Sequence, residues 1–142
     1  MKKILVIIAC ILIATIACSD DNTITGQQRD EIMAYADPAA ENLLAGFNEE
    51  DHAKFSRDFS EQMKNAMTEP VFKQTREGIV SKIGLYKSRN LFKVEKKGPH
   101  IVVLYKAEFE KESGVEVKVV FTKYGEKDLV SGLWFNSPKL RE

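Results

Sequence analysis

Cysteine is the residue type whose placement in this chain indicates chemistry. The 142 residues include only two cysteines, Cys10 and Cys18, and both lie within the first eighteen positions. The rest of the chain therefore offers no thiol nucleophile, no disulfide framework and no cysteine zinc site. Cys18 lies where an uninterrupted apolar run meets Asp20 and Asp21. A thiol at such a border is delivered at a membrane surface, where it can accept a lipid as a thioether.

The first seventeen residues have the layout of a secretory signal peptide. Lys2 and Lys3 form a positive n-region, and residues 4–17 are apolar apart from Thr15. A helix formed by residues 4–17, at about 1.5 Å per residue, would be only about 21 Å long, whereas the hydrocarbon core of a bilayer is about 30 Å thick. The sequence therefore disfavours a spanning helix and predicts a signal peptide over residues 1–17.

The end of this run, Thr15-Ile16-Ala17-Cys18, resembles the lipobox of bacterial and archaeal lipoprotein signals, with Thr15 in place of the usual leucine. The resemblance implies cleavage after Ala17 and attachment of diacylglycerol to the Cys18 thiol. The protein would then be extracytoplasmic and anchored in a membrane. Cleavage by the ordinary signal peptidase and an uncleaved anchor are the alternatives, and Cys10 is interpreted as part of the apolar run.

Composition argues against several classes of function. The 21 basic residues balance the 21 acidic ones, and removal of residues 1–17 leaves a net charge of −2, so no positive field favours nucleic acid. His52 and His100 lie far apart in sequence, and we predict no metal site. No glycine-rich phosphate loop or nucleophile-elbow serine is present, so no cofactor and no catalytic residue is predicted.

The expected organisation is one folded domain behind a short tether. Residues 18–29 would form the lipidated cysteine and a flexible polar spacer. Residues 30–142 have 3.6-residue and then two-residue periodicity, which predicts a single α+β domain.

Three helices are expected at the start of this domain. Apolar spacing of three and four predicts the first over residues 30–47, interrupted or bent at Pro38. The second begins with Asp51 as its cap, because the apolar residues that follow recur at steps of four: Phe55, Phe59, Met63 and Met67. The third helix runs from Thr68 to Gly84.

Beyond Gly84 the period changes to two, which predicts a curved four-stranded antiparallel sheet under the helices. The strands are expected over residues 86–94, 101–109, 115–121 and 129–135. In the first strand, Tyr86, Phe92 and Val94 belong to one alternating set and Lys87, Arg89 and Leu91 to the other. Arg89 is therefore expected on the opposite face from Tyr86.

A twisted sheet covered by helices on one face can leave a conical pocket between the two layers. The candidate lining residues are Phe55, Phe59, Met63, Tyr86, Tyr105 and Trp134. The alternative is that this aromatic and sulfur stripe is simply the hydrophobic core. The strand carboxylates of Glu108, Glu110 and Glu116 alternate with apolar residues and are expected to face away from the pocket, so the sequence offers no acid or base inside it.

Residues of the predicted helices and the last strand carry a family resemblance. The stretch "ENLLAGFNEEDHAKFSRDFSEQMKNAMTEPVFKQ" and the later "VSGLWFNSP" resemble the family catalogued as domain of unknown function 3887 over about residues 39–138. That family is similar to the nuclear transport factor two-like superfamily, whose members have a cystatin-like, cone-shaped α+β fold. The resemblance implies this fold and transfers no functional residue, because none is established for the family.

The expected function is binding without catalysis. The domain would bind a small apolar ligand in the cone or a protein partner, while the diacylglycerol at Cys18 anchors it to the membrane. A small lyase or isomerase, or a hydrolase-associated domain, that uses the cone pocket is one alternative. A structural dimerisation module is the other, with a homodimer formed through the sheet or its free edges.

Overall fold

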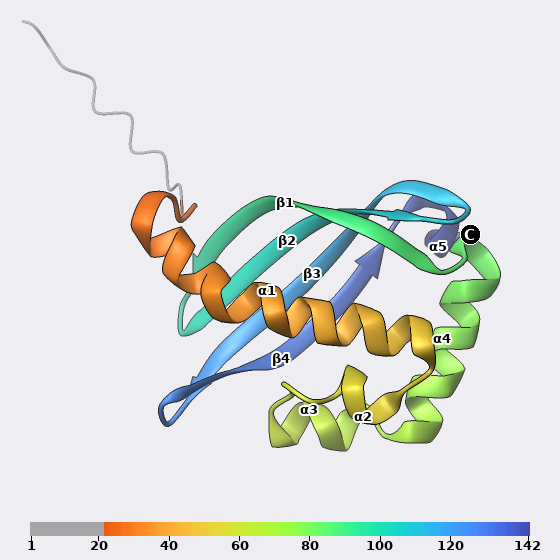
Figure 1. Cartoon of the computed structure of the whole chain (residues 1–142), viewed down its shortest axis with the longest axis horizontal. Coiled ribbons are helices and arrows are strands. Elements are labelled where there is room, and N and C mark those ends of the chain that lie inside the picture. The colour runs from red at the N-terminus through yellow and green to blue at the C-terminus, as the bar shows by residue number, and fades with distance from the viewer. Residues whose placement is uncertain (1–21) are drawn as a thin grey trace, which may run out of the picture.

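The computed structural model describes residues 22–142 as an α+β fold in which helices precede a four-stranded sheet (Figure 1). The elements are α1 (Gly26–Glu49), α2 (His52–Phe55), α3 (Glu61–Ala66), α4 (Glu69–Ile83), β1 (Tyr86–Lys97), β2 (His100–Phe109), β3 (Glu112–Tyr124), β4 (Lys127–Asn136) and α5 (Pro138–Arg141). The predicted signal peptide and Cys18 lie outside the described residues. Within residues 22–142, no helix combines the length and hydropathy that crossing a bilayer requires.

The sheet has the order β1-β2-β3-β4 with every neighbouring pair antiparallel, which confirms the predicted strand number and pairing. Gly98 and Gly125 have positive φ in the turns that join β1 to β2 and β3 to β4, a conformation that glycine adopts without steric cost. Burial alternates along β3, where Val115, Val117 and Val119 are fully buried. These side chains define the inner face of the sheet, against which the helices pack.

Helix α1 is longer than predicted and runs through Pro38 without interruption. Of the two outcomes predicted at Pro38, the interruption was wrong, because the packing of the whole helix decides whether it continues. Ala36, Ala40 and Leu43 are buried on its inner side, and small alanine side chains let the helix lie close to the sheet. Their burial outweighs the roughly 3 kcal/mol that an interior proline costs.

Regular structure begins before residue 30, within the stretch predicted as a spacer. Thr23 forms an antiparallel bridge with Glu95, and the amide of Ile24 donates to the Val94 carbonyl at 2.7 Å. The side chain of Ile24 is buried in the core. The edge of β1 offers unpaired backbone groups, and this short segment satisfies several of them.

The second predicted helix is two short helices, α2 and α3, and the short α5 after the sheet was not predicted, so the described residues contain five helices rather than three. Between α2 and α3 the backbone of residues 58–60 pairs with the edge of β4: the Val130 amide donates to Asp58 at 2.8 Å, and the Ser60 amide donates to Val130 at 2.9 Å. Ser60 then caps α3 by accepting from the Met63 amide. The apolar repeat of four predicted one continuous helix here, but the hydrogen bonds of residues 58–60 to the edge of β4 interrupt it.

Strand β1 departs from simple alternation. Its pairing with β2 has register shifts between Tyr86 and Ser88 and between Leu91 and Lys93. Each shift adds a residue and changes which face the following side chains occupy. As a result Arg89 lies on the inner face with Tyr86, and Phe92 is 61% exposed. The predicted division of β1 into two faces was therefore wrong at these positions.

Candidate functional site

The six residues predicted to line a pocket do not meet around one cavity. Phe55 and Phe59 are buried and pack edge to face, with ring centroids 5.1 Å apart. The Phe55 ring also lies 4.5 Å from that of Phe72 on α4. These three rings fill the space between α2, α4 and the sheet, so they behave as core.

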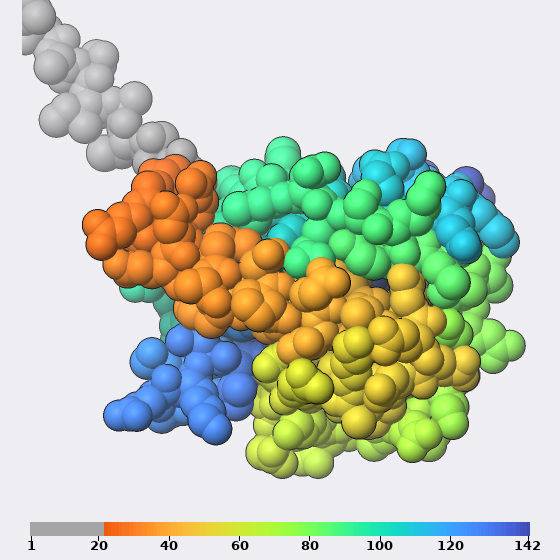
Figure 2. Space-filling model, viewed as in Figure 1, coloured from red at the N-terminus to blue at the C-terminus, as the bar shows by residue number. Residues whose placement is uncertain are grey.

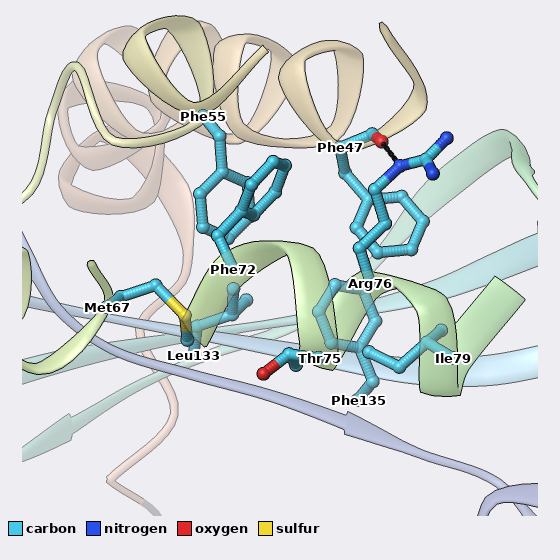
Figure 3. Close-up of a pocket in the computed structure, with 9 residues that line it drawn as sticks. All are labelled: Phe47, Phe55, Met67, Phe72, Thr75, Arg76, Ile79, Leu133 and Phe135. Atoms are coloured by element: carbon cyan, nitrogen blue, oxygen red, sulfur yellow. Dashed lines mark hydrogen bonds between the residues drawn. The ribbon is translucent and has the colours of Figure 1, made fainter. Parts of the chain in front are cut away.

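A small cavity of about 50 Å³ remains beside these rings (Figure 3). Its lining residues come from α1, α2, α4, β4 and the turn before α4: Phe47, Phe55, Met67, Phe72, Thr75, Arg76, Ile79, Leu133 and Phe135. Such a cavity admits a few waters, and it is far smaller than the roughly 300–1,000 Å³ of small-molecule sites. Of the six predicted residues, only Phe55 lines it.

Arg76 is the charged residue at the wall of this cavity, and it ties α4 to the end of α1. Its Nε donates to the Phe47 carbonyl at 2.5 Å, as Figure 3 shows, and its Nη2 donates to the Asn48 carbonyl at 3.1 Å. A cation at the C-terminus of a helix stabilises the unpaired carbonyls there. The contacts of Arg76 thus give it a structural role.

The other predicted residues lie in three places. Met63 is partly buried against the core. Trp134 points to the outer face of the sheet, where it is 53% exposed. Tyr86 and Tyr105 lie on the inner face of β1 and β2, and they line a second, larger cavity.

This second cavity is an open cleft of about 420 Å³ between α1 and the first half of β1. It lies where α1 runs beside β1, as Figure 2 shows with α1 in orange to gold and β1 in green. We call it the Arg89 cleft. Its lining residues are Asp37 and Glu41 of α1, Tyr105 of β2, and Tyr86, Lys87, Ser88, Arg89 and Leu91 of β1.

Arg89 connects β1 to α1 at the centre of the cleft. Its Nη1 donates to Glu41 Oε2 at 2.6 Å and to the Tyr86 hydroxyl at 3.0 Å. Its Nη2 donates to Asp37 Oδ1 at 2.8 Å and more weakly to the Asp37 carbonyl at 3.3 Å. The guanidinium carbon lies 5.3 Å from the centroid of the Tyr105 ring, within the range of a cation–π contact. The arginine thus holds the middle of α1 against the sheet.

Exposure differs strongly between Arg89 and its acidic partners. The Arg89 side chain is 11% exposed, whereas those of Asp37 and Glu41 are 56% and 62% exposed. Both carboxylates keep much of their hydration while they neutralise the arginine. Because buried charges are costly unless paired, this arrangement lets the fold hold a guanidinium near its core.

The pKa values of Arg89 and Tyr105 are both raised above their ordinary values. Burial opposes the charge of Arg89, but its hydrogen bonds to Glu41, Tyr86 and Asp37 outweigh burial and raise its pKa above the ordinary value. Burial, helped by the charge of Asp37, raises the pKa of Tyr105 above the usual value for a tyrosine, and Arg89 only partly offsets this. Arg89 therefore stays charged and Tyr105 stays protonated at neutral pH, so neither is suited to proton transfer.

Two polar atoms in the cleft lack hydrogen bonds. In residues 22–142 the buried side-chain atoms without a partner are Arg89 Nε and the Tyr105 hydroxyl. The Tyr105 hydroxyl lies near Asp37 and Arg89, whose charges and polar contacts both shift its pKa, but no hydrogen bond of good geometry joins it to either residue. A buried polar atom left unpaired costs about 1–3 kcal/mol. Both unpaired buried side-chain atoms of the described residues therefore belong to residues that line this cleft.

The chemistry available here is recognition by hydrogen bonding. The cleft offers arginine and tyrosine donors beside carboxylate acceptors. Across the described part of the chain, no three histidine, cysteine or acidic side chains gather where they could hold a metal ion. The cleft is therefore equipped to bind a small polar molecule.

Sequence reasoning did not identify the three central residues of the cleft, Asp37, Glu41 and Arg89. Arg89 was expected on the face opposite Tyr86 because of the simple alternation in β1. Charged residues four apart on a helix are ordinarily a solvated face. A signal was nevertheless present, since Tyr86 and Tyr105 were both assigned to the inner face.

The outer face of the sheet carries a different set of side chains, of which Phe92 and Trp134 are exposed and the others are half-buried. We call Phe92, Leu104, Lys106, Lys118 and Trp134 the outer patch. Cross-strand pairing places Leu104 beside Lys118 and Lys118 beside Trp134. Lys118 Nζ lies 5.0 Å from the Trp134 ring, and Lys106 Nζ lies 5.1 Å from the Phe92 ring. The patch crosses all four strands and faces away from the helices.

The sequence was compared with family models and with curated proteins. The family model described as "Protein of unknown function (DUF3887)" matches residues 40–128, which is more than half of the chain and extends from the middle of α1 to the start of β4. No curated protein matches the chain.

Proposed function

The chain belongs to the DUF3887 family of proteins of unknown function, and from that premise we propose that it is an extracytoplasmic lipoprotein whose α+β domain binds a protein partner without catalysis. Diacylglycerol on Cys18 holds the domain at the membrane. The proposal includes the cone-shaped arrangement of the nuclear transport factor two-like superfamily, which agrees with helices packed on one face of an antiparallel sheet.

The observation that carries the proposal is the outer patch. Phe92 and Trp134 are 61% and 53% exposed, although large aromatic side chains are ordinarily buried. Each ring is accompanied by a lysine. Exposed aromatic side chains beside cations are the composition of a protein-binding surface, in which the aromatic rings bury apolar area and the charges set the orientation. The complementary partner presents an apolar surface with an acidic rim.

The filled core supports a protein partner over a small apolar ligand. Phe55, Phe59 and Phe72 occupy the position at which an apolar ligand was expected. The space left beside them is about 50 Å³. A ligand of ordinary size would have to displace packed aromatic rings, at a cost of several kcal/mol for each ring removed from the core.

The anchor is tested by mass spectrometry of the protein recovered from membranes after expression of the full chain. We expect an N-terminal peptide that begins at Cys18 and carries diacylglycerol. The variant Cys18→Ser should lose the lipid and retain residues 1–17, because serine cannot form the thioether. An unmodified chain that begins at another residue would refute the anchor and leave the binding proposal standing.

Binding at the outer patch is tested by a photo-crosslinking residue placed at Trp134 in the membrane-anchored full chain. We expect a crosslinked product of higher mass, and the additional change Phe92→Glu should reduce it at least about fivefold. The matched control places the same crosslinker at Val71, which is exposed on α4. Equal products from both positions would contradict the proposal, and a product of twice the chain mass would assign the patch to a homodimer instead.

A further inference from the structure

The strongest unexplained feature of the inner face is the polar floor of the Arg89 cleft. Tyr105 is 1% exposed, and its hydroxyl and Arg89 Nε are the buried side-chain atoms of residues 22–142 that have no hydrogen-bond partner. Both belong to residues that line the same open cleft of about 420 Å³. Buried polar groups in folded proteins are ordinarily paired, so two exceptions at one cleft point to a group from outside the chain.

The charges around the cleft restrict the chemistry of that group. Asp37 and Glu41 contribute two negative charges, and Arg89 and Lys87 contribute two positive charges. An anion entering the cleft meets both carboxylates, and a cation meets the guanidinium and the lysine. A neutral group that both donates and accepts hydrogen bonds encounters neither repulsion.

The unpaired atoms call for such a group. Arg89 Nε can only donate, whereas the Tyr105 hydroxyl can donate or accept. A single hydroxyl group can accept from the first and bond to the second, and neighbouring hydroxyls can donate to the exposed carboxylates of Asp37 and Glu41. The Tyr86 ring and Leu91 provide apolar surface beside these groups for the carbon face of a ring.

We propose that the Arg89 cleft binds a neutral, polyhydroxylated small molecule of the sugar or cyclic polyol class. The site lies on the inner face of the sheet, so it is separate from the partner surface proposed above. Arg89 Nε and the Tyr105 hydroxyl are covered in the free protein, and binding therefore includes a small outward shift of the Arg89 side chain. The exposure of Asp37 and Glu41 leaves both carboxylates free to follow it.

The test is a titration followed by NMR of the full chain, held in lauryldimethylamine oxide micelles because that detergent has no sugar headgroup. The neutral probes are D-glucose, N-acetyl-D-glucosamine and myo-inositol, each raised to about 100 mM to detect dissociation constants of about 1–10 mM. We expect at least one of them to shift the Arg89 Nε–H signal and the amide signals of Asp37 and Glu41. Shifts with the sugars alone identify a saccharide site, and shifts with inositol identify a broader polyol site.

Charged probes test the argument from charge. Glucose 6-phosphate and protonated glucosamine resemble glucose but carry a negative and a positive charge. We expect each to bind at least about fivefold more weakly than the best neutral probe. Tighter binding of either charged probe would overturn the proposal, as would unchanged cleft signals with all three neutral probes.

The variant Tyr105→Phe tests the floor of the cleft. It deletes only the unpaired hydroxyl, so we expect affinity for the neutral probe to fall at least about fivefold while thermal stability is kept or increased. The matched control Tyr124→Phe removes a hydroxyl from an exposed tyrosine outside the cleft and should leave affinity unchanged. Full affinity in Tyr105→Phe would overturn the assignment of this hydroxyl to ligand binding.

Discussion

The aromatic cavity beside Phe55 and the Arg89 cleft both lie on the inner side of the sheet, but one is nearly closed and the other is open. Their volumes are about 50 Å³ and about 420 Å³. The Phe55 ring of α2 and the Phe72 ring of α4 border the first, with their centroids 4.5 Å apart. Two half-exposed carboxylates and a nearly buried guanidinium border the second.

The difference shows how side-chain chemistry decides whether space between two layers is filled. Apolar rings gain free energy by excluding water from one another, so they close the space they surround. Carboxylates lose hydration when they are buried, so Asp37 and Glu41 stay at the surface and keep the space beside them open. The aromatic residues at helical spacing therefore form part of the hydrophobic core, and the open cleft lies beside the charged side chains of Asp37, Glu41 and Arg89.

The largest loss of stability is expected for a substitution beside the aromatic cavity. Phe72→Ala removes a fully buried ring that packs on Phe55, and we expect it to lower the free energy of unfolding by about 3–5 kcal/mol. The measurement is denaturant unfolding followed by circular dichroism. Val71→Ala, at the neighbouring exposed position, should cost less than about 1 kcal/mol. Similar losses in the two variants would mean that these rings are not a packed core.

A smaller loss is expected on the open side. Arg89→Met removes hydrogen bonds to Asp37, Glu41 and Tyr86, and we expect a cost of about 1–3 kcal/mol in the same unfolding experiment. The loss is limited because both carboxylates remain hydrated when the arginine is absent. The exposed Arg57→Met serves as the control and should change stability little. A loss as large as that of Phe72→Ala would show that the contacts of Arg89 contribute as much to the free energy of unfolding as a buried aromatic ring does.

A single carboxylate of the cleft should contribute less again. Glu41→Gln keeps the shape of the side chain but removes its charge, and since Glu41 is 62% exposed we expect a loss of about 0.2–1 kcal/mol. The effect should shrink in high salt, which screens exposed ion pairs. Glu61→Gln, whose partner Lys64 lies on the same short helix, provides a matched exposed pair. An effect that does not depend on salt would indicate that this interaction is buried.

The smallest change at neutral pH is expected for Tyr105→Phe, within about 1 kcal/mol and in the stabilising direction, because the lost hydroxyl is unpaired. Its effect should appear at alkaline pH. Burial raises the pKa of Tyr105 above its usual range and that of Tyr35 to about 12. Folding favours the protonated form of both tyrosines. Their contribution to the free energy of unfolding is therefore complete below about pH 10, where an unfolded tyrosine is still protonated, and it is lost as the pH rises above that value.

Thermal unfolding between pH 8 and pH 11 measures this loss, because an unfolded tyrosine, with a pKa of about 10, is protonated at pH 8 and mostly ionised at pH 11. We expect the wild-type protein to lose more stability over this range than Tyr105→Phe. Equal losses in the two proteins would mean that solvent reaches the Tyr105 hydroxyl, so that Tyr105 would not form a buried floor of the cleft.

Much of the fold follows from local patterns. The change from helical to two-residue periodicity at Gly84 located the start of the sheet, and glycine turns fixed the four antiparallel strands. The break between α2 and α3 did not follow, because it depends on hydrogen bonds between residues 58–60 and β4, some seventy positions later. The interruption predicted at Pro38 was wrong for a related reason, since burial along the whole of α1 outweighs a local penalty.

The site was harder to predict than the fold. Of six expected pocket residues, Tyr86 and Tyr105 line the open cleft, and Phe55 borders the small cavity. Trp134 was misplaced, because the register of β4 directs its side chain to the outer face. Arg89 was concealed by a register shift in β1 that no residue type indicates. Asp37 and Glu41 were missed because charged residues four apart on a helix ordinarily face solvent.

The sequence by itself determined the order of helices and strands and the family of the chain, because these depend on periodicity and on residues close together in the sequence. It also placed a lone cysteine at the end of an apolar run, from which the anchor is proposed. Only the tertiary structure brought Asp37 and Glu41 to Arg89 across some fifty residues, and only it turned Trp134 outward. A shift of one residue in strand pairing exchanges the faces of a sheet, and that shift is decided by packing rather than by local sequence.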